Sequence, residues 1–191
     1  MVTSMSMSAV SVHPKYVFGC DGTILDSLHM LDDTKFVYIA GHNVVVHNLD
    51  DPLNQTFIPG SFWMHSINRL VVSHEEKPKY LAVCEKGERA QVTIYETSNL
   101  KTRKRILPCE PNQLSEHVTN AQEFLSCAFS PKQSQQYLIT LSGEPDWKVI
   151  FWQWERNGGS AQAVLGLDVT DILTAGSDGI PRPETFQCSL Y

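Results

Sequence analysis

The chain has 191 residues, of which 42% are hydrophobic and 19% charged, a composition typical of a globular protein with a core rather than of a disordered one. Its 21 acidic residues outnumber its 15 basic residues, which gives a net charge of −6 at pH 7. Because phosphate binding needs a basic face, this charge argues against nucleic acid as the main partner.

The first fifteen residues carry no basic segment followed by an apolar run, and no stretch long enough to cross a membrane. We expect a flexible tail over residues 1–15, no signal peptide and no membrane contact. Residues 16–191 alternate between short apolar runs and turn signals such as Asn157-Gly158. They are expected to form one all-β unit.

Five cysteines are present, an odd number with no Cys-x-x-Cys pair: Cys20, Cys84, Cys109, Cys127 and Cys188. Three of them, Cys84, Cys127 and Cys188, fall within or beside predicted strands. The pattern favours small buried apolar residues over disulfides, and it is typical of a reducing compartment such as the cytoplasm.

Three apolar runs recur in the same order and at one constant offset further along the chain. The first set is Leu70–Ser73, Tyr80–Val83 and Val92–Glu96, and the second is Ala128–Ser130, Tyr137–Thr140 and Val149–Trp152. An upstream copy consists of Ile24–Leu31, Phe36–Ala40 and Val44–His47. In this copy we align Phe36 with Tyr80 and Val44 with Val92, which makes the second turn four residues shorter.

A further copy begins at Phe186–Tyr191, which resembles Leu125–Ser130 when Cys188 is aligned with Cys127. The predicted repeats therefore cover about 20–50, 62–107 and 122–166, with the next one starting at 184. Short strands rich in β-branched and aromatic residues that return at such spacing are typical of β-propeller blades.

The repeats predict about three blades and one further strand, whereas closed propellers use roughly four to eight blades. We therefore expect residues 16–191 to be the N-terminal part of a propeller that is incomplete in this chain. Either a longer polypeptide or other chains in an assembly complete it. Tyr16–Gly19 is a candidate first strand, which in many propellers completes the last blade.

Propellers make contacts through the loops that connect their strands. The polar stretch Pro108–Ala121 predicts a long connection with a helical turn near Leu114–Val118. The loops expected to make contacts are Glu85–Arg89, Gly143–Asp146 and Asp168–Pro183. Acidic pairs at the tips between runs indicate turns rather than calcium or catalytic sites: Asp32-Asp33, Asp50-Asp51 and Glu75-Glu76.

One segment resembles a catalytic motif. Tyr16 to Ser27 is similar to the first motif of the haloacid dehalogenase phosphatases, an apolar strand followed by D-x-D-G-T. The nucleophile position is occupied by Gly19, which has no side chain to attack phosphorus, so Asp21-Gly22-Thr23 is expected to be only a turn. The chain also lacks that family's alternating strands and helices, and we expect no enzyme activity.

No metal or cofactor site is expected. The seven histidines have no metal-ligand spacing, and His42 and His47 lie five apart, which on a strand places them on opposite faces. The aromatic residues Trp147, Phe151, Trp152 and Trp154 surround one predicted strand and are expected to belong to the core.

The one charged cluster with a functional interpretation is Lys101, Arg103, Lys104 and Arg105. It follows the strand Val92–Tyr95 after a turn and is expected to be the outermost strand of its blade. Outer strands commonly carry basic residues to block edge pairing, and this is the interpretation we favour. The alternative is docking onto an acidic protein surface such as a tubulin lattice, with salt-sensitive affinity.

The repeat resembles the WD-repeat propeller. Ala128–Pro131 matches its Phe-Ser-Pro turn, and Tyr95-Glu96 and Trp152-Gln153 stand where that family has Trp-Asp. The Gly-His pair and a true Trp-Asp are missing, so the hydrogen-bonded tetrad that links these residues in the family is expected to be absent.

Six motifs in order resemble the N-terminus of the ciliary WD-repeat family of cilia- and flagella-associated protein 57, also called WD repeat-containing protein 65. They are Tyr16–Gly19, Phe57–Ser61, Val92–Glu96, Arg103–Leu107, Cys127–Pro131 and Phe151–Glu155. That family carries two propellers and a long coiled coil. The resemblance implies a non-enzymatic scaffold of the axoneme that docks on complexes of the doublet microtubules and positions or regulates inner dynein arms.

The resemblance implies a location in the cytoplasm, cytoskeleton and axoneme of the cilium or flagellum, with axonemal proteins as partners and no nucleic acid, membrane or small-molecule substrate. Two alternatives stay open. One is a WD-repeat adaptor of a non-ciliary cytoplasmic complex, and the other is a phosphatase-like enzyme.

Overall fold

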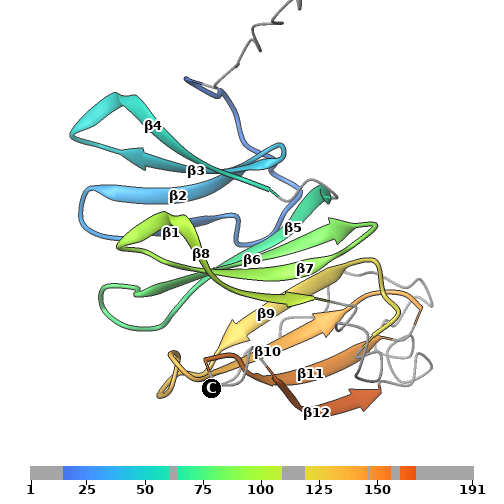
Figure 1. Ribbon diagram of the computed structural model, residues 1–191. Helices are drawn as coiled ribbons and strands as arrows, with labels where there is room; N and C mark the ends of the chain where they lie inside the picture. Colours follow the sequence, from blue (N-terminus) through green and yellow to red (C-terminus); the bar gives the residue numbers. More distant parts are fainter. Residues whose placement is uncertain (1–14, 61–63, 109–118, 146, 156–159, 167–191) are drawn as a thin grey trace, which may run out of the picture.

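The computed structural model describes residues 15–60, 64–108, 119–145, 147–155 and 160–166. Within these ranges the regular elements are β-strands, and they form three four-stranded antiparallel sheets (Figure 1). The first sheet contains β1 (Leu28–Met30), β2 (Lys35–Ala40), β3 (Asn43–Asn48) and β4 (Asp51–Pro59). The second contains β5 (Met64–Val72), β6 (Tyr80–Gly87), β7 (Gln91–Glu96) and β8 (Asn99–Pro108). The third contains β9 (Phe124–Phe129), β10 (Tyr137–Ser142), β11 (Lys148–Gln153) and β12 (Ser160–Gly166).

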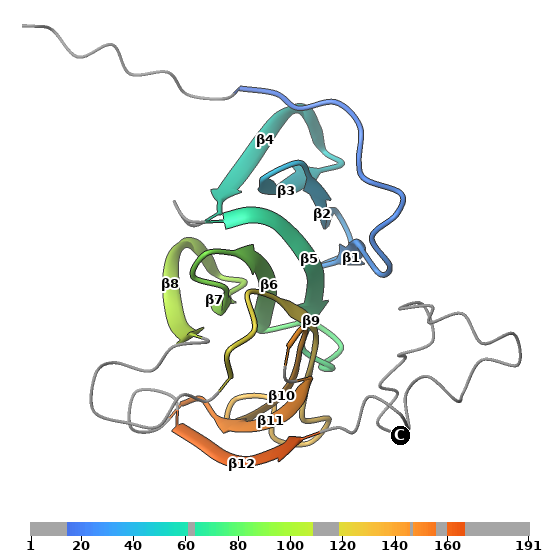
Figure 2. The ribbon, with the colours of Figure 1, turned by 90° about the vertical axis from the view of Figure 1, so that its right-hand side faces the viewer.

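Each sheet is a simple meander in which the strands follow chain order. The first strand of each sheet lies on the inner side, where β5 contacts both β1 and β9, and the fourth strands β4, β8 and β12 lie outermost (Figure 2). Four-stranded meanders arranged around a common inner side are propeller blades. The predicted all-β, incomplete propeller is therefore confirmed.

The repeat that relates Ser73 to Ser130 is visible in the backbone hydrogen bonds of the second and third sheets. The Ser73 N–H donates to the Tyr80 carbonyl at 2.9 Å, and the Ser130 N–H donates to the Tyr137 carbonyl at 3.1 Å. At the next turn, Thr97 donates to Lys79 at 3.0 Å, just as Trp154 donates to Gln136 at 3.0 Å. The first three strands of these two sheets therefore match at the offset that their sequences predict, whereas β12 pairs with β11 one residue out of step with the pairing of β8 and β7.

The predicted alignment of the first sheet is wrong by one residue on β2. The equivalent bonds there run from Leu31 N–H to the Lys35 carbonyl at 2.8 Å and from Leu49 N–H to the Thr34 carbonyl at 2.7 Å. Lys35, not Phe36, therefore occupies the place of Tyr80, and the second turn is three residues shorter rather than four. The sequence alignment paired two aromatic rings, but a slip of one residue moves every side chain of a strand to the other face.

The limits of the first sheet also differ from expectation. The first strand is only Leu28–Met30 instead of Ile24–Leu31, and β4 extends to Pro59, beyond position 50 where the repeat was drawn to end. Asp51 and Pro52 lie within β4, although the pair Asp50-Asp51 was expected to mark a turn. An outermost strand tolerates proline because one of its edges has no ladder partner.

Tyr16–Gly19 does not form a strand in the structure. Its backbone is instead held by a side chain of β4: the Val17 N–H donates to Gln55 Oε1 at 2.9 Å, and Gln55 Nε2 donates to the Val17 carbonyl at 3.3 Å. Gln55 also contacts Tyr38 at 3.3 Å. The segment therefore lies along the face of the first sheet that points away from the second.

The core consists of two apolar clusters, one between each pair of neighbouring sheets. Side chains of β6 alternate between them, because Leu81 and Val83 pack toward the first sheet while Ala82 and Cys84 pack toward the third. This alternation follows from the two-residue period of a strand. The second sheet is therefore buried on both faces, and it joins all three sheets into one packed unit.

Two of the four aromatic residues expected in the core are fully enclosed. Trp154 and Trp152 are 0% and 2% exposed, whereas Phe151 and Trp147 are half-buried. The Trp152 indole donates to Thr140 Oγ1 at 2.8 Å, and the Trp154 indole donates to the Ser134 carbonyl at 3.0 Å. The third sheet thus keeps a buried side-chain hydrogen bond between its two middle strands, although the Gly-His and Trp-Asp pairs are missing from the sequence.

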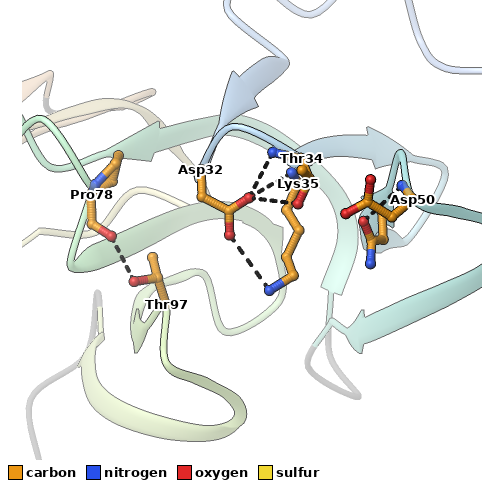
Figure 3. A network of polar contacts seen from close by, with 7 residues as sticks. Asp32, Thr34, Lys35, Asp50, Pro78 and Thr97 are labelled. Atoms are coloured by element: carbon orange, nitrogen blue, oxygen red, sulfur yellow. Dashed lines mark hydrogen bonds and ion pairs between the residues drawn. The ribbon is translucent and has the colours of Figure 1, made fainter.

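The acidic tip at Asp32 forms a turn, as its sequence predicts, whereas in the pair Asp50-Asp51 only Asp50 lies in a turn and Asp51 begins β4. Asp32 Oδ1 accepts hydrogen bonds from the backbone N–H groups of Thr34 at 2.9 Å and Lys35 at 2.8 Å (Figure 3). The Asp50 N–H donates to Asn48 Oδ1 at 3.0 Å in the following turn of the same sheet, and Thr97 in the second sheet donates to the Pro78 carbonyl at 2.6 Å.

Several predictions fall outside the described residues. They concern the tail up to residue 14, the helical turn near Leu114–Val118, the loop Asp168–Pro183, the strand Phe186–Tyr191 and the cysteines Cys109 and Cys188. Among the described residues, the structure contains no helix that is long and apolar enough to span a membrane.

Candidate interaction site on the outer strand

The basic cluster lies on β8, the outermost strand of the second sheet (Figure 1). Within the described ranges β8 pairs only with β7, so its other edge carries free backbone N–H and C=O groups. The prediction that these residues form the outer strand of their blade is confirmed. Lys101, Arg103 and Lys104 are exposed, and Arg105 is half-buried.

Lys104 is held against its own sheet. Its ammonium group forms an ion pair with Glu96 at the end of β7 and lies 5.4 Å from the centre of the Tyr80 ring. The hydrogen bond to Glu96 raises the pKa of Lys104, and burial opposes this effect. The side chain therefore lies across the face of the sheet and stays partly exposed.

Arg105 links the second sheet to the third. Its Nη2 donates to the backbone carbonyl of Glu155, just beyond β11, at 3.0 Å. Arg103 pairs with Tyr95 in the ladder between β8 and β7, and its charge acts on the pKa of the Tyr95 hydroxyl. Burial raises the pKa of Tyr95, while the charge of Arg103 and its hydrogen bond act in the opposite direction.

Lys101 differs from the other three cations. It is exposed and has no ion pair with any residue that the structure describes. Three of the four predicted site residues thus have internal partners, which fits a strand whose charges protect its edge and hold the sheets together. Lys101 is the exposed cation of this cluster that has no partner among the residues that the structure describes.

Sequence reasoning did not find a second group of polar residues, which lines a cavity of about 350 Å³ on the inner side. Arg69 on β5 pairs with Asp26 at 2.5 Å, and His29 on β1 contacts the Leu70 carbonyl through Nε2 at 2.8 Å. Because a carbonyl only accepts, this His29 nitrogen carries the hydrogen. The partners in each pair lie far apart in sequence, so only the packing of the two sheets brings them together.

The loops that were expected to make contacts are shorter in the structure than the sequence predicted, or lie partly outside the described residues. Glu85 to Gly87 belong to β6, and Glu85 is only 2% exposed, so Glu88 and Arg89 alone form an exposed turn there. In the other loop the Gly143 N–H donates to the Glu123 carbonyl at 3.0 Å, and Glu144 and Pro145 are exposed. Asp146 lies outside the described residues.

The phosphatase-like segment has the geometry of a turn. Gly19 has a φ of 82°, in the left-handed region that favours glycine, and Asp21 is exposed. Asp21 Oδ1 accepts hydrogen bonds from the Thr23 hydroxyl at 2.6 Å and the Thr23 N–H at 2.9 Å. Both hydrogen bonds lower the pKa of Asp21, and the bond from the Thr23 hydroxyl has the larger effect. The expected turn is confirmed.

Across the ranges that the structure describes, no group of three or more His, Cys, Asp or Glu side chains lies close enough together to hold a metal ion.

Two curated proteins are similar to this chain. Cilia- and flagella-associated protein 57 of Mus musculus is 32% identical over 151 residues, which is 78% of this chain. Cilia- and flagella-associated protein 57 C of Tetrahymena thermophila is 33% identical over 179 residues, which is 91% of this chain. The chain spans only 11% and 13% of the length of these two relatives.

No protein-family model matches the chain. Among solved structures, one described as the crystal structure of the eukaryotic initiation factor aligns with 73% of this chain and 31% of its own, with a TM-score of 0.48 and 17% sequence identity. The sequence matches confirm the relationship that the six motifs indicated: over most of its length, this chain resembles cilia- and flagella-associated protein 57.

Proposed function

We propose that this chain is a non-enzymatic, propeller-type scaffold module of the cilium or flagellum. The observation that carries the proposal is its similarity to two relatives from a mammal and a ciliate, both of which are named for cilia and flagella. The match extends over 78% and 91% of the chain, so it is much longer than a single repeat.

The proposed role is to dock on complexes associated with the doublet microtubules of the axoneme, where the module helps to position or regulate inner dynein arms. The partners are axonemal proteins, and the working location is the cytoskeleton of the cilium. A non-enzymatic role is supported by Gly19, which stands where the one catalytic motif resembled by this sequence needs a nucleophile.

The proposed contact is the exposed end of β8. Lys101 supplies a free positive charge, and Arg103, Lys104 and Arg105 contribute to the local potential while they remain engaged with their own sheets. An acidic protein surface is the complementary partner, and binding of this kind is steered by charge and weakened by salt.

Co-sedimentation of the purified chain with isolated axonemes tests this proposal. We expect the chain to pellet with axonemes at low salt and Lys101→Glu to weaken binding about fivefold, the scale of an exposed ion pair that is lost or reversed. The matched control is Lys132→Glu, an exposed lysine in the turn before β10, which is expected to bind like the wild type. An equal loss of axoneme binding in both variants would show that β8 is not the contact. If the wild-type chain did not pellet with axonemes, the proposal of axonemal docking itself would be wrong.

A second candidate is an adaptor of a cytoplasmic complex outside cilia, which the propeller-type fold serves equally well. Recovery of the chain with a soluble complex from cells without cilia, and not with axonemes, would favour this alternative. Hydrolysis of a generic phosphate ester that is abolished by Asp21→Ala would instead revive the phosphatase interpretation.

A further inference from the structure

A cavity of about 350 Å³ lies on the inner side of the molecule, among the first strands of the three sheets. Of these strands, β5 lies between β1 and β9 along one side of the molecule (Figure 2). The lining includes Arg69 of β5 and Ala128 of β9, together with Asp26 in the turn before β1. The volume is near the lower end of the range for ligand pockets, so the cavity has room for a side chain rather than for a large cofactor.

Arg69 is a largely enclosed cation at this cavity whose hydrogen-bonding capacity is not fully satisfied. Its side chain is 15% exposed, and its Nη2 atom pairs with Asp26 Oδ2 at 2.5 Å. Its Nε atom is buried and has no hydrogen-bond partner among the described residues. A guanidinium binds a carboxylate most strongly through two parallel N–H donors, and a buried donor without a partner is costly. Asp26 therefore satisfies Arg69 only in part.

Asp26 is the exposed member of this ion pair. Its side chain is 61% exposed, and it lies in a turn rather than in a strand. Its φ is 51°, in the left-handed region that is uncommon for residues other than glycine. Because an ion pair with an exposed member contributes little to stability, the Asp26 carboxylate can leave the guanidinium at low cost. Arg69 cannot leave in the same way, since its side chain is largely enclosed.

The rest of the lining suits an acidic side chain. Asp26 is the only carboxylate among the described residues that line the cavity, so its departure leaves a positive charge unopposed there. His29 and His74 add imidazole groups to the lining, and Val72 and Ala128 supply apolar surface for the methylene groups of a ligand. Charge and shape are thus complementary to a carboxylate on a short aliphatic stem.

We propose that this cavity binds an aspartate or glutamate side chain from an acidic segment of a partner protein, that this carboxylate pairs with Arg69, and that Asp26 occupies its place until it binds. The ligand is a protein segment because the group that pairs with Arg69 in the structure is itself the carboxylate of an amino-acid side chain. The inference goes beyond the proposed function and does not depend on it, because β1, β5 and β9 surround the cavity whereas the proposed axonemal contact is on β8.

The experiment is a titration of the full chain with a fluorescent, end-blocked peptide of alternating glycine and glutamate, followed by anisotropy. We expect Asp26→Asn to bind this peptide about tenfold more tightly than the wild type, because the internal competitor loses its charge. Asparagine is the conservative replacement, since it also tolerates a left-handed φ. Asp33→Asn is the matched control: it removes the same charge from an exposed residue that does not line the cavity, and its affinity should equal that of the wild type.

Two further measurements identify the group that binds. The same peptide with glutamine in place of glutamate should not bind to Asp26→Asn, and adding Arg69→Gln to Asp26→Asn should abolish binding of the glutamate peptide. Poor folding of the Arg69 variant would not affect the main result, because poor folding cannot produce a gain of affinity in Asp26→Asn.

Three outcomes overturn the proposal. The first is equal binding of the glutamate peptide by the wild type and Asp26→Asn, or binding by neither. The second is an equal gain in Asp33→Asn, which would reflect net charge alone. The third is binding of free glutarate to Asp26→Asn as tightly as the peptide, which would mean that the cavity takes a small dicarboxylate and not a protein segment.

Discussion

At the scale of single residues, the third sheet contains a buried side-chain hydrogen bond that no sequence pattern predicts. Trp152 and Thr140 are 2% and 0% exposed, and the indole N–H of one donates to the hydroxyl of the other at 2.8 Å. A buried polar group that loses its partner pays its full cost of desolvation. This bond therefore fixes the relative position of the middle strands β10 and β11.

Replacing Trp152 by phenylalanine should lower the free energy of unfolding by about 1–3 kcal/mol, because Thr140 is then left without its donor. Urea denaturation of the wild type and the variant measures this change. The double variant with Thr140→Val should lose less than the sum of the two single variants, since it removes both partners together. Strict additivity would mean that the hydrogen bond contributes nothing.

Asp32 predicts a dependence on pH. The pKa of Asp32 is lowered mainly by a hydrogen bond from the backbone N–H of Thr34. Hydrogen bonds from the Lys35 N–H and the Thr34 hydroxyl lower it further, and burial acts in the opposite direction. Since the folded pKa lies below the unfolded value of about 3.9, the stabilisation is present above that value and is lost as the pH falls through the folded pKa.

The stability difference between the wild type and Asp32→Ala should therefore be largest at neutral pH and should shrink below about pH 4. Denaturation curves at several pH values measure it. Asp33→Ala is the control, because Asp33 is exposed and has no hydrogen bond to a described residue. A difference for Asp32→Ala that stays constant from about pH 7 to about pH 3 would contradict this account.

At the scale of elements, the second sheet is the centre of the molecule because both of its faces are covered. Leu81 on β6 is 0% exposed and packs toward the first sheet, while Leu53 on the outer strand β4 is 86% exposed. The same residue type thus occupies the two extremes of burial within neighbouring sheets. The contribution of a leucine to the free energy of unfolding therefore depends on the position of its strand in the sheet and not on its hydrophobicity alone.

Truncating Leu81 to alanine should lower the free energy of unfolding by about 2–5 kcal/mol, the range for a buried leucine that leaves a cavity. The identical change at Leu53 should alter it by less than about 0.5 kcal/mol. Thermal or chemical denaturation of the two variants measures both values. Similar losses at the two sites would mean that β4 is covered by something that the described residues do not contain.

Much of the element order could be predicted from the sequence. The runs around Tyr80 and Tyr137 give two sheets whose first three strands match, because strand periodicity and turn residues are local signals. The basic run after Val92–Tyr95 was predicted as the outermost strand, and β8 confirms this. The prediction failed on β2, where an aromatic match at Phe36 outweighed the backbone register.

The polar contacts between sheets could not be predicted. The pairs formed by Arg69 with Asp26 and by Arg105 with Glu155 join residues far apart in the chain, and no periodic pattern marks them. The site itself was predicted only as a cluster of positive charge. That Arg103, Lys104 and Arg105 have internal partners, whereas Lys101 has none among the described residues, depends on how β7, β8 and the third sheet pack.

At the scale of the whole molecule, the three sheets form consecutive blades whose loops and outer strands present surfaces for binding. The apolar clusters on both sides of the second sheet pack these blades into one unit, which supports the proposal of a module that binds partners. Its similarity to two proteins named for cilia and flagella leads to the proposal that these partners are axonemal.

The most direct test of this proposal is the location of the protein in ciliated cells, measured by fractionation into demembranated axonemes, soluble ciliary matrix and cell bodies. The account predicts that most of the protein found in cilia stays with the axonemes after detergent and is released only as the salt concentration rises. Recovery of the protein in cell bodies alone, with none on the axonemes at low salt, would contradict it.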